Sequence, residues 1–323
     1  MTFKATHAAM AGIAMLMLSA GQTAAQEWPS QPITFIVPFA AGGNTDLIAR
    51  LIAPALSERL GQPVIVDNRP GAGGTTATAE VARAAPDGYT MQVGDISTHG
   101  IGPLIYEQIA YDPVTDFAPV IQATNVSLVM VANKDLGLAS VADLVERAKA
   151  DPDDFAYASS GIGSPQHLAF EYFKSLAGID IVHVPYNGSA QALTDVVAGH
   201  VQVMIDGTAV PQVQSGGLTG LAVTGTERSA ALPDTPTMEE AGIPGYSFMS
   251  WHGIFFPAGV PDEIVSRMNA EIRTILDSEA TRKRLSDLNI DVAGGSPEDF
   301  SAHIAAQTAK LQKLIDLAGV TAQ

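Results

Sequence analysis

Ile33–Leu60 reads ITFIVPFAAGGNTDLIARLIAPALSERL: a short apolar run, a glycine loop and an amphipathic stretch in succession. The run Ile33–Pro38 has the β-branched and aromatic residues typical of a strand, and Asn44–Leu60 has apolar residues at helical spacing. The loop Ala40–Asp46 joins the two. A strand that passes through a short loop into a helix is the repeating unit of α/β proteins, so this stretch predicts the fold class.

The same alternation returns along the chain and predicts mostly parallel sheets with helices on both faces. We expect further strands at Val64–Asp67, Thr90–Val93, Phe155–Ser159, Ile181–Val184, Val201–Ile205 and Leu218–Val223. We expect the helices between them at Thr75–Arg83, Pro165–Leu176, Ala190–Ala198 and Thr208–Ser215. The tail Asp262–Leu317 has a helical pattern, with one strand expected at Asp291–Ala293.

The length of 323 residues fits two domains. The long, nearly uncharged stretch Ala118–Ala132 is typical of two extended segments that carry the chain from one domain into the next. We therefore expect a first lobe built from residues 26–125 and 225–323, and a second lobe built from residues 126–224, with a ligand cleft between them.

The first 25 residues have the order of a secretory signal peptide. Lys4 is the only charged residue in Met1–Ala25, the apolar stretch Ala8–Ala20 follows it, and the small residues Thr23, Ala24 and Ala25 come last. We expect cleavage near Ala25 and export of a soluble mature protein.

The composition excludes several classes of function. The chain has no cysteine, which removes disulfides, thiol nucleophiles and thiolate metal sites, and its seven histidines show no metal-ligand spacing. We therefore expect no metal and no cofactor. A formal net charge of −17 argues against nucleic acids and anionic membranes as partners. An anionic ligand stays compatible with that charge, because a buried anion interacts mainly with its nearest dipoles.

Glycine loops stand at three junctions between a strand and a helix: Ala40–Asp46, Arg69–Gly74 and Ser159–Ser164. In open α/β sheets, ligands bind at the carboxyl ends of strands, where helix N-termini offer free N–H groups to an anion. We expect a ligand carboxylate between two helix N-termini, one after Gly43 and one after Gly163. Gly43 is expected to have a positive φ.

Each of these features also has a purely structural interpretation. Asn44 or Thr45 can simply cap a helix, Asp206 can cap the helix that follows it, and His167 can be a core residue. The sequence contains no nucleophile-elbow motif of the esterases, no phosphate-binding P-loop motif and no zinc-protease motif. A hydrolase that uses Ser164 or Ser160 with His167 stays open as an alternative.

Several longer segments together resemble the Bug-type receptors, the substrate-binding family of tripartite tricarboxylate transporters. They cover nearly the whole mature chain and include WPSQPI (Trp28–Ile33), VPFAAGGNTDLIAR (Val37–Arg50), LGQPVIVDNRPGAGG (Leu60–Gly74), AAPDGYT (Ala84–Thr90), YDPVTDFAPV (Tyr111–Val120), YASSGIGSPQHLAFEYFKSLAGID (Tyr157–Asp180), HVPYNGSAQALTDVVAGHVQVMID (His183–Asp206), ALPDTPTMEEAG (Ala231–Gly242) and SWHGIFFPAGVP (Ser250–Pro261). The resemblance implies a periplasmic binding protein of type II, with two hinged α/β lobes and the ligand between them. It also implies a monomeric receptor in the periplasm that performs no bond chemistry.

The resemblance further implies which residues contact the ligand. They are Ala41, Gly42, Gly43, Asn44, Thr45, Asp46, Ser97 and Thr98 in the first lobe, and Ser159, Gly163, Ser164, His167, Asn187, Ser189 and Asp206 in the second. Two positions depart from the family pattern, since many relatives have Lys where this chain has Asn187 and Asn where it has Gly207. The missing lysine favours a ligand with a neutral or monoanionic end.

The implied function is capture of a small carboxylate for the membrane subunits of a tripartite tricarboxylate-type transporter. Dicarboxylates, tricarboxylates, amino acids and aromatic acids all fit this description. A sensor kinase is the alternative partner, because a receptor of either kind would act through its closed form.

Overall fold

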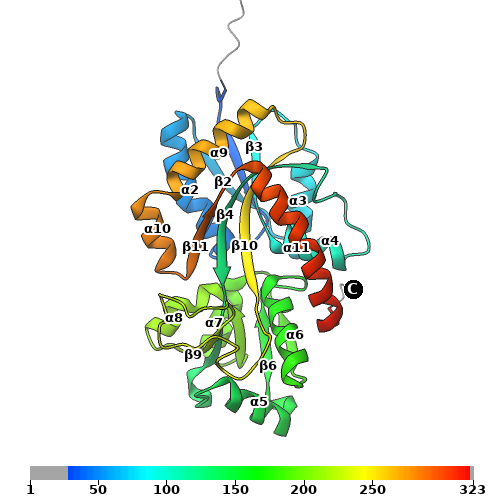
Figure 1. Ribbon diagram of the computed structural model, residues 1–323, viewed down its shortest axis with the longest axis vertical. Helices are drawn as coiled ribbons and strands as arrows, with labels where there is room; N and C mark the ends of the chain where they lie inside the picture. The colour runs from blue at the N-terminus through cyan, green and yellow to red at the C-terminus, as the bar shows by residue number, and fades with distance from the viewer. Residues whose placement is uncertain (1–27, 321–323) are drawn as a thin grey trace, which may run out of the picture.

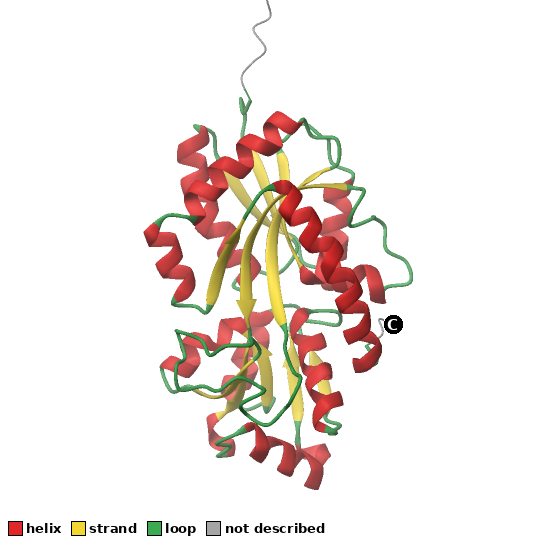
Figure 2. Cartoon of the chain, viewed as in Figure 1, coloured by secondary structure: helices red, strands yellow, loops and turns green. Residues whose placement is uncertain are grey.

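The computed structural model describes residues 28–320, which form two lobes stacked along the long axis of the molecule (Figure 1). Each lobe has one β-sheet with helices packed around it (Figure 2). The predicted signal peptide and its cleavage near Ala25 lie outside the described residues.

The sheet of the first lobe has the strand order β11–β4–β10–β3–β1–β2. Its strands are β1 (Ile33–Val37), β2 (Val64–Asn68), β3 (Thr90–Asp95), β4 (Phe117–Ser127), β10 (Met249–Pro257) and β11 (Ile290–Gly294). Strand β1 pairs in parallel with β2 and β3, whereas β10 lies antiparallel to β3 and β4, and β11 lies antiparallel to β4. It follows that β1, β2, β3 and β4 all run in one direction.

The sheet of the second lobe has the strand order β7–β6–β8–β5–β9. Its strands are β5 (Val129–Asn133), β6 (Ala156–Ser159), β7 (Val182–Pro185), β8 (Val203–Asp206) and β9 (Leu218–Val223). Strand β6 pairs in parallel with β7 and β8, and β5 runs antiparallel to β8 and β9. Only β5 is reversed in this sheet, so both lobes have the α/β architecture with mostly parallel strands that the sequence predicts.

Helices cover both sheets. Those of the first lobe are α2 (Asn44–Leu60), α3 (Thr75–Ala82), α4 (Gly102–Ile105), α9 (Asp262–Leu276), α10 (Glu279–Ser286) and α11 (Pro297–Ala318), and those of the second are α5 (Val141–Ala150), α6 (Pro165–Ala177), α7 (Ser189–Ala198) and α8 (Val210–Gln214). In α9, Val265, Met268 and Ile272 are buried at intervals of three and four residues, which turns one face of the helix to the core. Across residues 28–320, no helix is both long enough and apolar enough to traverse a lipid bilayer.

Two crossings join the lobes. The first is direct, because β4 ends at Ser127 and β5 begins at Val129. Here Leu128 N–H donates to Thr224 Oγ1 at 2.8 Å, and Thr224 N–H donates to Leu128 O at 2.9 Å. After β9, residues 225–248 remain beside the second lobe, where Tyr246 donates its hydroxyl to Ala169 O of α6 at 2.9 Å. The lobe boundaries stay a prediction, and these contacts favour placing the return crossing near residue 248 rather than near Thr224.

Three elements were not expected from the sequence, of which the short helix α4 is one. Helix α5 lies at the far end of the second lobe, and β10 runs through the middle of the first sheet between β3 and β4. Strand β10 is buried on both faces, so its sequence MSWHGIFFP lacks the alternation of apolar and polar residues that identifies a half-buried strand.

Candidate functional site

A cavity of about 450 Å³, including the part open to solvent, lies at the carboxyl ends of β1, β3 and β6. The cavity is lined from both lobes by Phe39, Ala40, Gly43, Asn44, Thr45, Asp95, Ser160, Pro165, Gln166, Gly188, Ser189, Ser250 and His252. None of these lining residues is a lysine or an arginine, so a ligand anion must be held by dipoles.

The N-terminus of α2 opens onto this cavity. Its N-cap residue is Gly43, which has no side chain to cap the first-turn N–H groups. The sequence-based expectation of a positive φ at Gly43 is wrong: its φ is −86°, and there is no atom within 4 Å of an added Cβ. The positive φ, +95°, belongs to Gly42, where a side chain would be strained.

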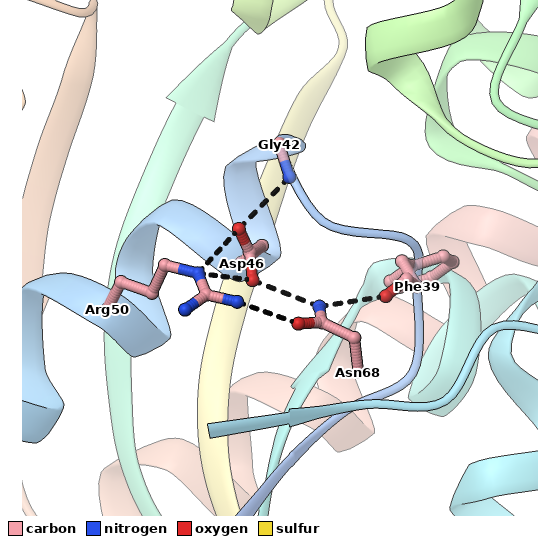
Figure 3. A network of polar contacts seen from close by, with 5 residues as sticks. All are labelled: Phe39, Gly42, Asp46, Arg50 and Asn68. Carbon is pink, nitrogen blue, oxygen red and sulfur yellow. Dashed lines mark hydrogen bonds and ion pairs between the residues drawn. The ribbon is translucent and has the colours of Figure 1, made fainter. Parts of the chain in front are cut away.

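A polar network behind the cavity fixes this loop (Figure 3). Asp46 accepts hydrogen bonds from Gly42 N–H at 3.0 Å, from Arg50 Nε at 2.9 and 3.0 Å, and from Asn68 Nδ2 at 2.9 Å. Asn68 also donates to Phe39 O at 3.0 Å and accepts from Arg50 Nη2 at 2.9 Å. Burial tends to raise the pKa of Asp46, but the donors from Arg50, Gly42 and Asn68 hold it below its usual value. Asp46 therefore positions the loop as a carboxylate.

The N-terminus of α7 lies across the cavity from that of α2. Its N-cap Gly188 provides no side-chain cap, and Gly188 and Ser189 line the cavity. A Cβ built on Gly42 would lie 3.2 Å from Ala190 Cβ, and one built on Gly188 would lie 3.3 Å from Ala40 Cβ. The two loops are therefore in contact, with an uncapped helix end on each side.

Helix α6, which the sequence suggested as the second helix end, is already capped by its own residue. Ser164 Oγ accepts a hydrogen bond from His167 N–H at 3.2 Å, and the first helical residue, Pro165, has no N–H group. The structure thus favours α7 over α6 as the counterpart of α2.

Gln166 forms part of the cavity wall and connects several polar groups. Its Oε1 accepts from Ser160 Oγ at 2.8 Å, and its Nε2 donates to Asp206 Oδ2 at 2.9 Å and to Ser189 Oγ at 3.3 Å. The other oxygen of the fully buried Asp206 accepts from the N–H and hydroxyl of Thr208 at 2.7 and 2.8 Å. Asp206 therefore acts on the cavity through Gln166 and also caps the short 3₁₀ turn Gly207–Ala209 that precedes α8.

Asp95 lies at the end of β3 and lines the cavity. Its Oδ1 accepts from Ser97 N–H at 3.0 Å, from Ser97 Oγ at 2.6 Å, from Thr98 N–H at 3.0 Å and from Thr98 Oγ1 at 3.2 Å. Ser97 and Thr98 do not line the cavity, so their role is to orient Asp95. Burial raises the pKa of Asp95, although these hydrogen bonds act in the opposite direction.

Two residues of β10, Ser250 and His252, complete the lining. His252 Nδ1 lies 3.1 Å from Thr124 Oγ1, on the neighbouring strand β4. Burial lowers the pKa of His252 to about 3, so the ring is neutral at physiological pH and brings no positive charge.

His167 belongs to a stack of rings behind the second glycine loop. Its Nδ1 accepts from Gly163 N–H at 3.2 Å, and its ring lies 4.2 Å from that of His183 between centroids. Ser159 Oγ lies 2.7 Å from His183 Nε2 and is fully buried. These contacts hold the loop in shape.

The serine–histidine pairs considered for a hydrolase do not form in the structure. Ser164 contacts the backbone of His167 rather than its ring, and Ser160 donates to Gln166. Among residues 28–320, no group of three or more acidic or histidine side chains is placed to hold a metal ion.

A wider hollow forms the mouth of the cleft, with Asn187, Tyr106 and Ile162 among its lining residues. Tyr106 donates its hydroxyl to Ile162 O in the opposite lobe at 3.2 Å. Deeper in, a Cβ on Gly207 would lie 2.5 Å from Asn44 Nδ2. Gly207 thus leaves room for Asn44 to reach across from the first lobe.

The predicted contact residues fall into three groups, and their contact with a ligand stays a prediction. Gly43, Asn44, Thr45 and Ser189 line the cavity, and Asn187 lines its mouth. The rest, which line neither hollow, are Ala41, Gly42, Asp46, Ser97, Thr98, Ser159, Gly163, Ser164, His167 and Asp206.

The cavity also has lining residues outside the set of predicted contacts: Phe39, Ala40, Asp95, Ser160, Pro165, Gln166, Gly188, Ser250 and His252. Of these, Ala40 and Ser160 belong to glycine loops that the sequence did indicate. Asp95 could have been predicted from the sequence, because it ends a strand at the same sheet edge as the glycine loops. Ser250 and His252 could not have been predicted in this way, because β10 was not recognised as a strand.

Comparison with known proteins gives matches over most of the chain. Residues 48–320 match the model of the tripartite tricarboxylate transporter family receptor. The protein BugT of Bordetella pertussis is 36% identical over 302 residues, which are 92% of this chain and 93% of BugT.

Two solved structures also match this chain over most of its length. A protein of R. palustris solved with adipate has a TM-score of 0.89 and 39% identity, covering 91% of this chain and 99% of that one. MatC from Rhodopseudomonas palustris, solved with bound malate, has a TM-score of 0.85 and 34% identity, covering 89% of this chain and 100% of MatC.

Proposed function

This chain belongs to the tripartite tricarboxylate transporter receptor family of periplasmic solute-binding proteins, and we propose that it delivers a small carboxylate to the membrane subunits of such a transporter. The family consists of binding proteins without catalytic activity. The adipate and malate held by two relatives support a small carboxylated metabolite as the ligand class. The leader-like order of Met1–Ala25 supports export to the periplasm with cleavage near Ala25.

The observation that carries this proposal is the pair of uncapped helix ends, α2 after Gly43 and α7 after Gly188, on opposite sides of one cavity. Each helix end has free N–H groups and the equivalent of about half a positive charge. A carboxylate between them would accept hydrogen bonds from both lobes, replacing the missing side-chain caps. The negative charge on the surface of the protein weakens binding of this carboxylate only slightly, because salt screens surface charges over about 8 Å.

Capture then follows from geometry, without any bond being made or broken. A ligand that contacts α2 and α7 together binds the closed arrangement better than an open one, so it shifts the protein towards closure. The closed shape is what transporter subunits would recognise. Uptake of the ligand into cells should therefore require both this receptor and those subunits.

The test is to replace the ligand carboxylate by one supplied by the protein. In Gly43→Asp, the new side chain has open space and an allowed backbone angle, and Asp is a preferred N-cap. It should occupy the α2 amides, leave the melting temperature unchanged or raised, and abolish binding of small carboxylates in calorimetry. Wild-type protein at 100 times the Kd of its ligand should gain about 2.7 kcal/mol of stability.

Gly43→Ala is the matched control, since it adds a Cβ without an acceptor and should bind nearly as wild type does. Normal carboxylate binding by folded Gly43→Asp would show that the α2 N-terminus is not the anchor. Failure of every carboxylate tested to bind wild-type protein would overturn the proposed ligand class.

A further inference from the structure

The cavity has a second polar region on its sheet side, formed by Asp95 of β3 and His252 of β10. These residues are directly opposite each other in the antiparallel pairing of the two strands, so their side chains lie on the same face. Each has only 3% of its surface exposed, and both line the cavity. The proposed carboxylate anchor uses neither of them.

Asp95 has one carboxylate oxygen without a partner. The four hydrogen bonds to its carboxylate, from Ser97 and Thr98, all reach Oδ1. Within residues 28–320, Oδ2 has no hydrogen-bond partner, although the side chain is buried against the cavity. Oδ2 is not among the buried side-chain atoms that lack a partner, so it is open to the cavity, where a ligand group can reach it.

His252 presents a similar free position. Its Nδ1 is engaged by Thr124 Oγ1 at 3.1 Å, and its Nε2 has no partner in the described part of the chain. The Thr124 hydroxyl can donate or accept, so the neutral ring can have its proton on either nitrogen. His252 can therefore accept a hydrogen bond at Nε2 or donate one there, next to an oxygen that prefers to accept.

The charge around this pair decides which ligand group fits it. The ionised form of Asp95, which its hydrogen bonds from Ser97 and Thr98 favour against the effect of burial, would repel a second ligand carboxylate placed here. No lysine or arginine lines the cavity to offset that repulsion. A hydroxyl or ammonium group would instead donate to Asp95 Oδ2. A hydroxyl could also accept from His252 Nε2, and an ammonium could donate to it.

We propose that Asp95 and His252 form a specificity subsite for a hydrogen-bond donor, hydroxyl or ammonium, at the end of the ligand remote from its carboxylate. This inference rests on the proposed function, because it takes the carboxylate to be held at α2 and α7. It narrows the ligand class to hydroxy acids and amino acids, in contrast to the adipate held by one relative.

The experiment compares ligands that differ only in the remote group. Calorimetry on wild-type protein would measure four matched series of straight-chain acids, ending in a hydroxyl, an ammonium, a carboxylate or a methyl group. The best hydroxyl- or ammonium-ended acid should bind at least about tenfold more tightly than the dicarboxylate and the plain acid of equal length, about the discrimination that one polar contact provides. The tighter of the two series identifies which donor the subsite takes.

The variant Asp95→Asn should reverse this preference. Asparagine keeps an oxygen for the donors of Ser97 and Thr98 but replaces Oδ2 by an NH₂ group, which donates. The donor-ended acid should lose about tenfold in affinity, and the dicarboxylate of equal length should gain. Asp180→Asn removes one charge from a side chain that is 97% exposed, and it should leave the ranking unchanged.

The possible results separate the two proposals. If acids bind but the dicarboxylate or the plain acid binds as tightly as the donor-ended acid in wild-type protein, the subsite is wrong and the carboxylate anchor stands. An unchanged ranking in folded Asp95→Asn leads to the same conclusion. If no acid of any series binds, the proposed function itself fails. If Asp95→Asn does not fold, the ranking of ligand affinities in wild-type protein alone decides whether the subsite exists.

Discussion

Asp46 holds the loop in front of α2, because both of its carboxylate oxygens already accept hydrogen bonds from the protein. Its replacement by alanine would leave Gly42 N–H and one donor of Asn68 without a buried acceptor. We expect Asp46→Ala to lower the free energy of unfolding by about 1–3 kcal/mol and to weaken ligand binding, as measured by urea denaturation and calorimetry.

A second aspartate in an ion pair provides the control. Asp67 pairs with Arg69 at 2.8 Å, but both side chains are about two-fifths exposed (40% and 44%). Asp67→Ala should therefore change the free energy of unfolding by no more than about 0.5 kcal/mol and leave binding unchanged. Equal effects of the two substitutions would show that the network around Asp46 does not support the loop.

For individual residues, the sequence predicted which loops line the cavity better than it predicted the roles of side chains. Gly43, Asn44, Thr45 and Ser189 were predicted and do line the cavity, because the strand-to-helix junctions that hold them have clear local patterns. Gln166 was not predicted, since its importance comes from contacts with residues distant in sequence. No local pattern shows that a glutamine inside a helix will meet Asp206.

Within single elements, the buried histidines make the fold sensitive to acid. Burial lowers the pKa of His167 to about 4, and of His99, His183 and His252 to about 3, against about 6.5 in the unfolded chain. Below about pH 6.5 the unfolded chain gains protons that the folded protein does not. Stability should therefore be nearly independent of these groups above pH 7 and fall as the pH drops towards 4, by up to about 1.4 kcal/mol per pH unit for each histidine.

Urea denaturation between about pH 7.5 and pH 4.5 measures this dependence. His183→Phe should make the slope shallower by up to one proton, because phenylalanine can stay in the ring stack without titrating. His200 has a side chain that is 71% exposed, so His200→Gln is the control and should leave the slope unchanged. A slope that is the same in wild type and His183→Phe would exclude the ring stack as a source of acid sensitivity.

Helix α2, which the sequence predicted, and strand β10, which it missed, differ in their surroundings. Helix α2 was predicted with its observed bounds, because Ile48, Ile52 and Leu56 recur at four-residue spacing on one buried face. Strand β10 was missed because β3 and β4 flank it and both of its faces are covered. Its partners lie more than a hundred residues away in sequence, and they determine its conformation.

For the molecule as a whole, function depends on how the two lobes meet. Loops of the two lobes touch near Gly42 and Gly188, and α11 of the first lobe packs against α6 of the second. The sequence pattern predicted two lobes with a cleft but gave no information on these contacts, because they depend on the relative placement of distant segments. The sequence predicts hinges near Asn125–Ser127 and near Thr224, and the contacts in the structure favour the crossings at Leu128 and near residue 248 for this role.

The hydrogen bond across the cleft mouth gives a direct test of closure. Tyr106 of the first lobe donates to Ile162 O of the second at 3.2 Å, so this bond exists only when the lobes are together. Tyr106→Phe should destabilise the closed form by about 0.5–1.5 kcal/mol and thus speed ligand release roughly 2- to 13-fold, as measured by stopped-flow kinetics.

Tyr172 provides the matched control, because it also donates to a backbone carbonyl, Gly245 O at 2.8 Å, but within the second lobe. Tyr172→Phe should lower stability by a similar amount and leave the release rate unchanged, since its bond persists whether the lobes are open or closed. Small-angle scattering should in parallel show wild-type protein becoming more compact with ligand, and Tyr106→Phe less so at equal occupancy. Equal release rates in the two variants would mean that closure does not depend on the mouth and must be maintained by the ligand or by α11.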